Sequence, residues 1–202
     1  MRRFPSAICH VYLDDGIDLT CGTRIALDAK CLMPEVCNAM ETLLIHDRHS
    51  GHLPAVAEQF RANGVAVKGC ERTRRAAPDV DLATEQDWRT EYLDLVVSIR
   101  VVNGVGEAIR QINTFGSHHT DAIVTDSVAA ARRFTHEVDS AVVLVNASTM
   151  FCDAASLGMG AEIGIATGKL HARGPMGLEE LTSYKFVIRG AGHIMGAPGI
   201  NQ

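Results

Sequence analysis

The sequence has no apolar run near the roughly 20 residues that a membrane-spanning helix requires. Residues 1–5 (MRRFP) also lack the apolar stretch of a secretory signal peptide. Positive charge is sparse, since the net charge is −5 and the only short basic cluster is Arg72, Arg74 and Arg75. These absences argue against membrane insertion, secretion and nucleic-acid binding, and we expect a cytoplasmic protein.

Cysteine is present six times but never with CxxC spacing. With 47% hydrophobic residues in 202, the chain can bury a sizeable core and needs no disulfide framework. We therefore expect one ordinary globular domain with reduced thiols. The cysteines are Cys9, Cys21, Cys31, Cys37, Cys70 and Cys152.

Two motifs that resemble ligand sites are incomplete. His46, His49 and His52 recur at every third position, but no cysteine or carboxylate pattern accompanies them, so we expect no metal site. Residues 104–106 (GVG) lack the third glycine of a dinucleotide-binding fingerprint. We expect these glycines to begin a helix after a turn.

Apolar periodicity alternates between strand-like and helix-like segments along residues 8–145. Continuous apolar strands linked by helices predict an α/β fold with a largely parallel sheet covered by helices on both faces. Residues 71–86 are polar and predict a loop. The expected strands are 8–13, 42–46, 65–68, 95–102, 122–125 and 141–145, and the expected helices begin at Asp18 or span 53–62, 107–115 and 127–137.

The remainder of the chain is less regular. Residues 146–175 contain five glycines and predict a long loop, which in a compact domain is typically functional or disordered. Residues 182–189 alternate as an edge strand does. We expect the tail, residues 190–202, to be mobile.

Several ordered motifs of this sequence match one protein family. They include VCNA at 36–39, CHVYLD at 9–14, TEYLDL at 90–95, GSHHTDAIVT at 116–125 and the long segment 146–185. Through them the chain resembles the C-terminal catalytic half of γ-glutamyl phosphate reductase, a relative of the aldehyde dehydrogenases. The resemblance implies an aldehyde-dehydrogenase-type catalytic domain over residues 1–175. It also implies a C-terminal segment, 176–202, with an oligomerisation strand, and a nucleotide-binding domain that this chain lacks.

The reaction that the resemblance implies is the NADPH-dependent reduction of L-glutamyl 5-phosphate to L-glutamate 5-semialdehyde in proline biosynthesis. A thiolate displaces phosphate to form a thioester, and the thioester then accepts hydride. Cys37 matches the nucleophile of the family. Its place after Pro34, in a loop between a helix and a strand, suits that role independently. For the other five cysteines we expect small buried hydrophobes.

Two residues near the expected reaction centre have alternative roles. Glu91 matches the segment whose glutamate binds the nicotinamide ribose, and the alternative is a solvated acidic residue before a strand. Asn38 is a candidate to assist the backbone N–H of Cys37 in stabilising an oxyanion, and the alternative is capping of the adjacent backbone. We expect His119 to make a structural hydrogen bond.

The long loop holds the candidate substrate-binding residues. Hydroxyl, amide and cationic groups there suit the α-carboxylate of a glutamyl substrate, although residues 169–173 are equally typical of a basic surface loop or a subunit contact. Met33 and Met150 stand where the family usually has arginine. The candidates are Asn146, Ser148, Thr149, His171 and Arg173.

The resemblance also implies partners. They are a second copy of the chain or a separate N-terminal half, with association with glutamate 5-kinase as a further expectation. An alternative interpretation is a truncated or non-catalytic remnant that is inactive without a nucleotide-binding half. A fragment of a general aldehyde dehydrogenase fits less well, because residues 171–185 (HARGPMGLEELTSYK) are closer to the reductase.

Overall fold

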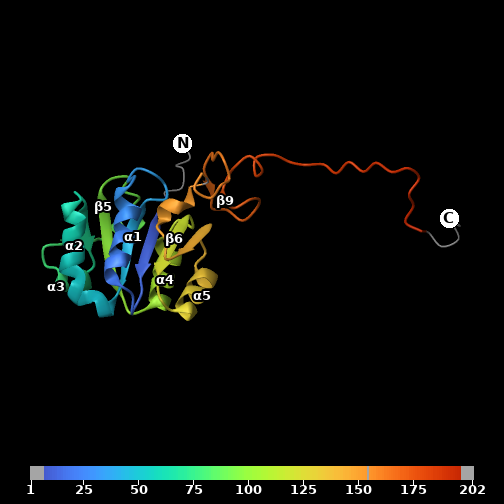
Figure 1. The fold of residues 1–202 in the computed structure, drawn as a ribbon. Helices are drawn as coiled ribbons and strands as arrows, with labels where there is room; N and C mark the ends of the chain where they lie inside the picture. Colours follow the sequence, from blue (N-terminus) through green and yellow to red (C-terminus); the bar gives the residue numbers. More distant parts are fainter. Residues whose placement is uncertain (1–6, 154, 197–202) are drawn as a thin grey trace.

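The computed structural model describes residues 7–153 and 155–196. Its centre is a seven-stranded sheet with strand order β4-β3-β5-β2-β1-β6-β7, in which every pair is parallel (Figure 1). This confirms the predicted α/β class. The strands are β1 (Cys9–Leu13), β2 (Met40–His46), β3 (Ala66–Gly69), β4 (Asp81–Leu82), β5 (Val96–Val102), β6 (Thr120–Val124) and β7 (Val142–Val145).

Helices connect consecutive strands, as parallel pairing requires. The α-helices are α1 (Leu19–Cys31), α2 (Leu53–Ala62), α3 (Glu71–Ala76), α4 (Val105–Phe115) and α5 (Val128–Glu137). The short 3₁₀ helices η1 (Asp47–His52) and η2 (Asp87–Arg89) lie between these helices, whereas η3 (Thr149–Cys152) follows β7. A small antiparallel pair, β8 (Ile165–Ala166) and β9 (Gly174–Pro175), comes after η3. Among the described residues, no helix is long and apolar enough to cross a membrane.

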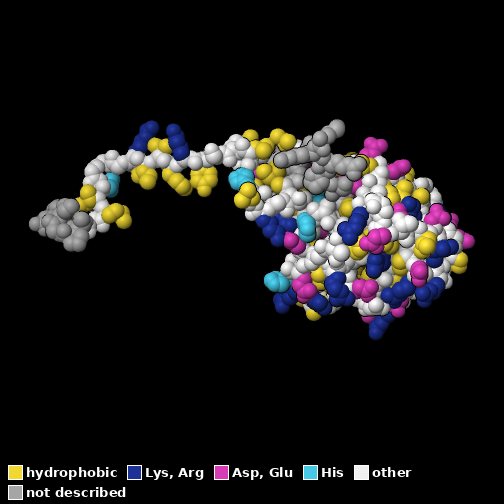
Figure 2. All heavy atoms as spheres, turned by 180° about the vertical axis from the view of Figure 1, so that it is seen from behind, with side chains coloured by type: hydrophobic (Ala, Val, Ile, Leu, Met, Phe, Trp, Pro, Cys, Tyr) yellow, Lys and Arg dark blue, Asp and Glu magenta, His cyan; other side chains and the backbone are white. Residues whose placement is uncertain are grey.

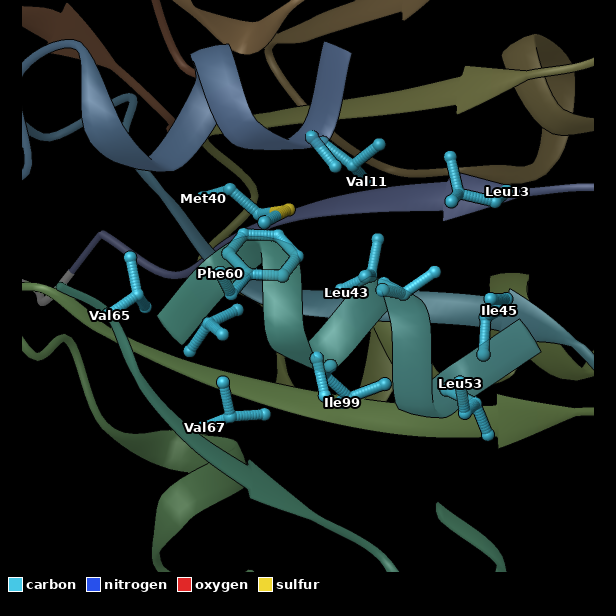
Figure 3. Packing of buried hydrophobic residues seen from close by; sticks show 14 of the residues in the cluster. Val11, Leu13, Met40, Leu43, Ile45, Leu53, Phe60, Val65, Val67 and Ile99 are labelled. Atoms are coloured by element: carbon cyan, nitrogen blue, oxygen red, sulfur yellow. The ribbon is translucent and has the colours of Figure 1, made fainter. Parts of the chain in front are cut away.

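Two apolar cores fill the spaces on either side of the sheet, because successive strand residues point to opposite faces. Val11 and Leu13 of β1 pack with α1 and α2, where Phe60 of α2 is fully buried (Figure 3). Tyr12, between them in sequence, packs on the opposite face with α4 and with Phe134 of α5. Both faces of the central strands are therefore covered.

Residues 71–86 correct the sequence prediction, since this stretch contains α3 and β4 and is not a loop throughout. Its charged residues face solvent, while Thr73 is fully buried and its Oγ1 donates to the Ile99 carbonyl at 2.9 Å. Ala77 and Val80 join the core beside β3 and β5. Only a few apolar contacts fix the segment, so its apolar periodicity is weak.

Helix starts follow the capping residues of the sequence. Asp18 caps α1 by accepting from the Thr20 N–H at 2.9 Å. Gly104 precedes α4 with φ of 154°, a conformation that favours glycine, so the GVG stretch begins a helix as expected. Ser127 caps α5 by accepting from the Ala130 N–H at 3.2 Å.

Replacing Ser127 by alanine is expected to lower the free energy of unfolding by about 1 kcal/mol, because the first turn of α5 loses its side-chain acceptor. Urea denaturation measures this change. Ser127→Asp retains an acceptor and serves as the matched control, so an equal loss in both variants would contradict the capping role.

The strand ends orient the rest of the chain. Residues 146–152 run back across the sheet, because the Asn146 N–H donates to the Ile123 carbonyl near the end of β6 while Cys152 Sγ accepts from Thr120 Oγ1 at its start. Beyond residue 182 the chain extends away from the body without regular structure (Figure 1). The predicted mobile tail includes residues 197–202, which lie outside the described residues.

Candidate active site

Cys37 lies in the loop between α1 and β2, at the amino end of the parallel sheet. Two turn hydrogen bonds shape this loop, from the Val36 N–H to the Met33 carbonyl and from the Ala39 N–H to the Val36 carbonyl. The cysteine is exposed, as the sequence position after Pro34 predicted. The loop thus presents a thiol at the surface of an otherwise buried strand start.

A cleft of about 580 Å³ opens beside this thiol and brings together residues that are far apart in the sequence. Cys37, Glu91 and His119 line it, together with Ile163 and Ile165 of the long loop. A smaller cavity of about 170 Å³ is also lined by Cys37, together with Asn38, Asp153 and Glu162, among others. Cys37 therefore borders two hollows.

The electrostatic surroundings keep the Cys37 thiol protonated. Partial burial raises its pKa, and the carboxylates of Glu162 and Glu91 raise it further. The backbone N–H groups of Cys37 and Asn38 oppose this by stabilising the thiolate. Both N–H groups therefore lie close to the sulfur atom.

Glu91 lies just before β5 and reaches the cleft as a half-buried carboxylate. Burial raises its pKa, whereas the backbone N–H of Ala7 lowers it by hydrogen bonding. The backbone just after Glu91 is bound by the buried Glu41. Its Oε1 accepts from the Leu93 N–H at 3.5 Å, and its Oε2 accepts from Lys30 Nζ at 2.8 Å. The structure therefore places the predicted Glu91 and Cys37 in the same cleft.

Asn38 is buried and its amide holds the long loop in place. The Nδ2 group donates to the carbonyl of Thr149 at 3.1 Å and to that of Met150 at 3.5 Å. These acceptors are distant in sequence, so the bonds are neither capping of the adjacent backbone nor a contact with the thiol. The side chain fixes the nucleophile loop to η3 instead of pointing its donors at the thiol.

Ser148 and Thr149 are both buried beside α1. Ser148 Oγ accepts from the Met150 N–H at 3.3 Å and so caps η3. Thr149 Oγ1 has no hydrogen-bond partner among the described residues although it is fully buried. Of the two hydroxyls, that of Thr149 retains free hydrogen-bonding capacity.

Asn146 lies far along the sheet from Cys37. Its Oδ1 accepts from the Thr125 N–H at 2.8 Å and its Nδ2 donates to the Thr125 carbonyl at 3.0 Å, at the carboxyl end of β6. Both polar groups of the side chain are thus engaged with backbone, and the backbone adopts a φ of 55°. In the structure Asn146 binds the backbone of Thr125, and it does not line the cleft that contains Cys37 and Glu91.

Arg173 is likewise engaged within the fold. Its guanidinium donates to Asp139 Oδ1 and to the Asp139 carbonyl, each at 3.1 Å, and to the Thr167 carbonyl at 3.1 Å. His171 is exposed, and neither residue lines the cleft beside Cys37. The structure therefore does not bring His171 or Arg173 together with Cys37. Arg173 instead binds the long loop to Asp139, just after the end of α5.

Met33 and Met150 line the same hollow, a cleft of about 730 Å³ between α1 and η3. Its charged lining residues are Arg24, Asp28 and Asp153. The two methionines make the cleft largely apolar where the resemblance led us to expect arginine. Among the described residues that line this cleft, Arg24 is the positively charged one.

His119 is the residue whose position the sequence prediction missed. We expected a structural hydrogen bond, and the ring does contact Thr120 Oγ1 through Nδ1 at 2.9 Å. It also lines the cleft with Cys37, at the start of β6. The available signal was its place directly before a buried strand, at the same sheet edge as the nucleophile loop.

No protein-family model matches the chain. Its sequence is 54% identical over 189 residues to γ-glutamyl phosphate reductase from Carboxydothermus hydrogenoformans, covering 93% of this chain and 46% of that protein. It is 48% identical over 187 residues to the same enzyme from Thermotoga maritima, covering 92% of this chain and 45% of that protein. The chain therefore spans about half the length of the curated relatives it matches.

Solved structures give the same result. The crystal structure of the Thermotoga maritima enzyme has a TM-score of 0.88 and 46% identity, covering 94% of this chain and 46% of that chain. An acetylating aldehyde dehydrogenase from Geobacillus thermoglucosidasius, at 16% identity and a TM-score of 0.58 over 75% of this chain and 42% of that chain, shares the fold. The chain belongs to the γ-glutamyl phosphate reductase family and corresponds to about half the length of its members.

Proposed function

We propose that this chain supplies the nucleophile for the NADPH-dependent reduction of L-glutamyl 5-phosphate to L-glutamate 5-semialdehyde in proline biosynthesis. The observation that carries this proposal is the exposed Cys37, which lines two hollows and whose sulfur interacts with its own N–H and with that of Asn38. A thiolate attacks the acyl carbon, the carbon–sulfur bond forms, and the bond from carbon to the phosphate oxygen breaks. The N–H pair stabilises the oxyanion that this step creates.

The cleft with Glu91 fits a nicotinamide nucleotide. A half-buried carboxylate beside Cys37 is a suitable acceptor for the two hydroxyls of a ribose, and the apolar walls from Ile163 and Ile165 suit a planar ring. When bound, the nicotinamide supplies the hydride that reduces the thioester. Within this chain Glu91 would hold the ribose hydroxyls in the cleft that Cys37 also lines. One solved relative of the fold, an engineered glycolyl-CoA reductase, has bound NADP⁺.

The smaller hollow, lined by Asn38, is the proposed place of the glutamyl group. Ser148 and Arg24 line the cleft next to it, which shares Met33 and Asp153 with this hollow. Thr149 is fully buried and acts through its carbonyl, which accepts from Asn38 Nδ2. His171 and Arg173 contribute to the α-carboxylate site only if the loop moves from its contacts with Asp139. We propose a cytoplasmic location, where glutamate 5-kinase produces the short-lived acyl phosphate and association with it shortens the transfer.

The test of this function is the reverse reaction. We expect reduction of NADP⁺ by glutamate 5-semialdehyde to depend on inorganic phosphate, because phosphate must cleave the Cys37 thioester. The 202-residue chain is measured alone and after addition of the nucleotide-binding half of a relative. Activity only in the mixture supports the half-enzyme alternative. Phosphate-independent turnover, or none in either sample from folded protein, would reject the proposed reaction.

We also propose that residues 182–189 pair with a second copy of the chain. This segment extends into solvent with apolar side chains unburied, among them Tyr184, Phe186 and Ile188, of which Ile188 is 92% exposed (Figure 2). Apolar side chains in such a row are rarely left in water. Alternate residues of an extended segment lie on one face, so a neighbouring sheet can cover all three.

Replacing Phe186 by aspartate is expected to shift the chain from dimer to monomer in sedimentation velocity, because a charge then enters the proposed apolar contact. Lys185→Asp alters the adjacent residue on the other face of the segment and serves as the control. A monomeric wild-type chain at micromolar concentration would contradict the pairing.

A further inference from the structure

The His119 ring closes one side of the cleft that contains Cys37. It is only 4% exposed, so little of the residue is accessible from the cleft. A single sulfur atom bridges the two residues, because Cys9 Sγ lies 3.3 Å from the Cys37 carbonyl and 3.7 Å from His119 Nδ1. His119 and the nucleophile loop are thus close neighbours across the start of β1.

We assign the tautomer of His119 from its neighbours. Thr120 Oγ1 donates its proton to Cys152 Sγ at 2.9 Å, so the same oxygen must accept from His119 Nδ1 at 2.9 Å. Cys9 has its proton on the Cys37 carbonyl and cannot donate to the ring. Nδ1 therefore bears the hydrogen, and Nε2 keeps its lone pair.

The lone pair of Nε2 faces the cleft. Within the described residues no hydrogen bond involves this atom, and it is not among the buried polar atoms without a partner, a group that does include His10 Nε2. Nε2 is therefore not fully buried, and the cleft with Cys37 is a hollow that His119 lines. A basic nitrogen is therefore available beside Cys37.

Both groups have the protonation that a proton transfer needs. Burial lowers the pKa of His119, opposed by Asp121 on β6, which keeps the imidazole neutral around pH 7. The Cys37 thiol, by contrast, has a raised pKa owing to burial and the carboxylates of Glu162 and Glu91. The other titratable groups at this position are the thiols of Cys9 and Cys152, and both have raised pKa values because of burial.

We propose that His119 is a catalytic residue, the base that removes the proton from Cys37 Sγ before acyl transfer. The inference rests on the proposed function of Cys37. The proton passes from Sγ to Nε2, the thiolate forms its bond to the acyl carbon, and phosphate departs with the electron pair of the broken carbon–oxygen bond. The imidazolium returns the same proton to Sγ when the aldehyde leaves, so His119 ends each cycle neutral.

The test measures alkylation of Cys37 by iodoacetamide at pH 7, followed at the Cys37 peptide by mass spectrometry. His119→Asn keeps an N–H donor for Thr120 but removes the basic nitrogen, and we expect the rate to fall about 10-fold or more. Thr120→Val removes the acceptor that fixes the tautomer, and we expect a smaller decrease. His118→Asn is the matched control, because His118 contacts the Asp139 carbonyl and does not line the cleft.

The outcomes separate this inference from the proposed function. Unchanged alkylation in folded His119→Asn and Thr120→Val would overturn the role of His119, even if Cys37 proved essential for turnover. A rate that falls in His119→Asn but not in His118→Asn supports it without any substrate. In that case a failure of turnover with glutamate 5-semialdehyde rejects the proposed substrate while the Cys37–His119 pair stands.

Discussion

Replacing Cys37 by serine is expected to lower phosphate-dependent turnover by at least about 10³-fold in the assembly that reduces NADP⁺. A serine hydroxyl is a much weaker nucleophile at neutral pH, and the carboxylates of Glu162 and Glu91, which already disfavour the Cys37 thiolate, oppose ionisation of a hydroxyl still more. The turnover rate that remains in Cys37→Ser measures the rate enhancement that substrate binding gives without the thiol nucleophile. Initial velocities at saturating semialdehyde and phosphate report the change.

Cys21→Ser is the control for loss of a thiol. Cys21 is exposed on α1 and lines the larger cleft, not the one with Glu91, so we expect its replacement to leave turnover nearly unchanged. Because the pKa of the Cys37 thiol is raised, the wild-type acylation rate should increase with pH until that thiol is ionised. A rate for Cys37→Ser within threefold of wild type, measured beside the control, would remove Cys37 from the mechanism.

Replacing Lys30 by methionine is expected to cost about 3–5 kcal/mol of unfolding free energy at pH 8. Lys30 is fully buried and its Nζ contacts Glu41 Oε2 at 2.8 Å, with Glu41 only 1% exposed. Burial raises the pKa of Glu41 from 4.5 to about 7, although Lys30 pulls it down. Without the lysine the carboxylate must either stay charged in a dry site or take up a proton.

The sign of the pH dependence follows from that raised pKa. The folded protein holds the Glu41 proton more tightly than the unfolded chain, so this contribution is fully present below pH 4.5 and is lost as the pH rises through about 7. The loss in Lys30→Met should therefore be larger at pH 8 than at pH 5, where Glu41 is already neutral. Urea denaturation at both values measures the difference.

An exposed ion pair provides the control. Arg48 Nη1 lies 2.7 Å from Asp15 Oδ2, but its side chain is 75% exposed, so we expect Arg48→Met to cost less than about 1 kcal/mol at either pH. Equal losses in the two variants would contradict the interpretation of Lys30–Glu41 as a buried pair. Since Glu41 also binds the Leu93 N–H, Lys30→Met should weaken nucleotide binding through Glu91 as well.

The sequence predicted those parts of the fold that depend on local pattern. The helix at 53–62 was predicted with its observed bounds, since apolar residues recur at its helical spacing and Asn63-Gly64 ends it. The cap at Ser127 was visible for the same local reason. The helix at Glu71–Ala76 was missed, because tertiary contacts of Thr73 fix it rather than an apolar stripe.

For the site, sequence motifs predicted chemistry better than placement. Cys37 and Glu91 were predicted and do share a cleft. Asn146 and Arg173 have the right polar groups, but the fold commits them to Thr125 and Asp139, which no local pattern indicates. His119 reaches Cys37 only because parallel pairing of β1 with β2 and β6 aligns their amino ends.

The most direct measurement of the central role of Cys37 is identification of the acylated residue after mixing the chain with an acyl phosphate. We expect a thioester on the Cys37 peptide that hydroxylamine removes and that is absent in Cys37→Ser. This measurement needs no nicotinamide and therefore concerns the nucleophile alone. A stable acyl group on another cysteine, with the Cys37 thiol still free to react with iodoacetamide, would contradict the assignment.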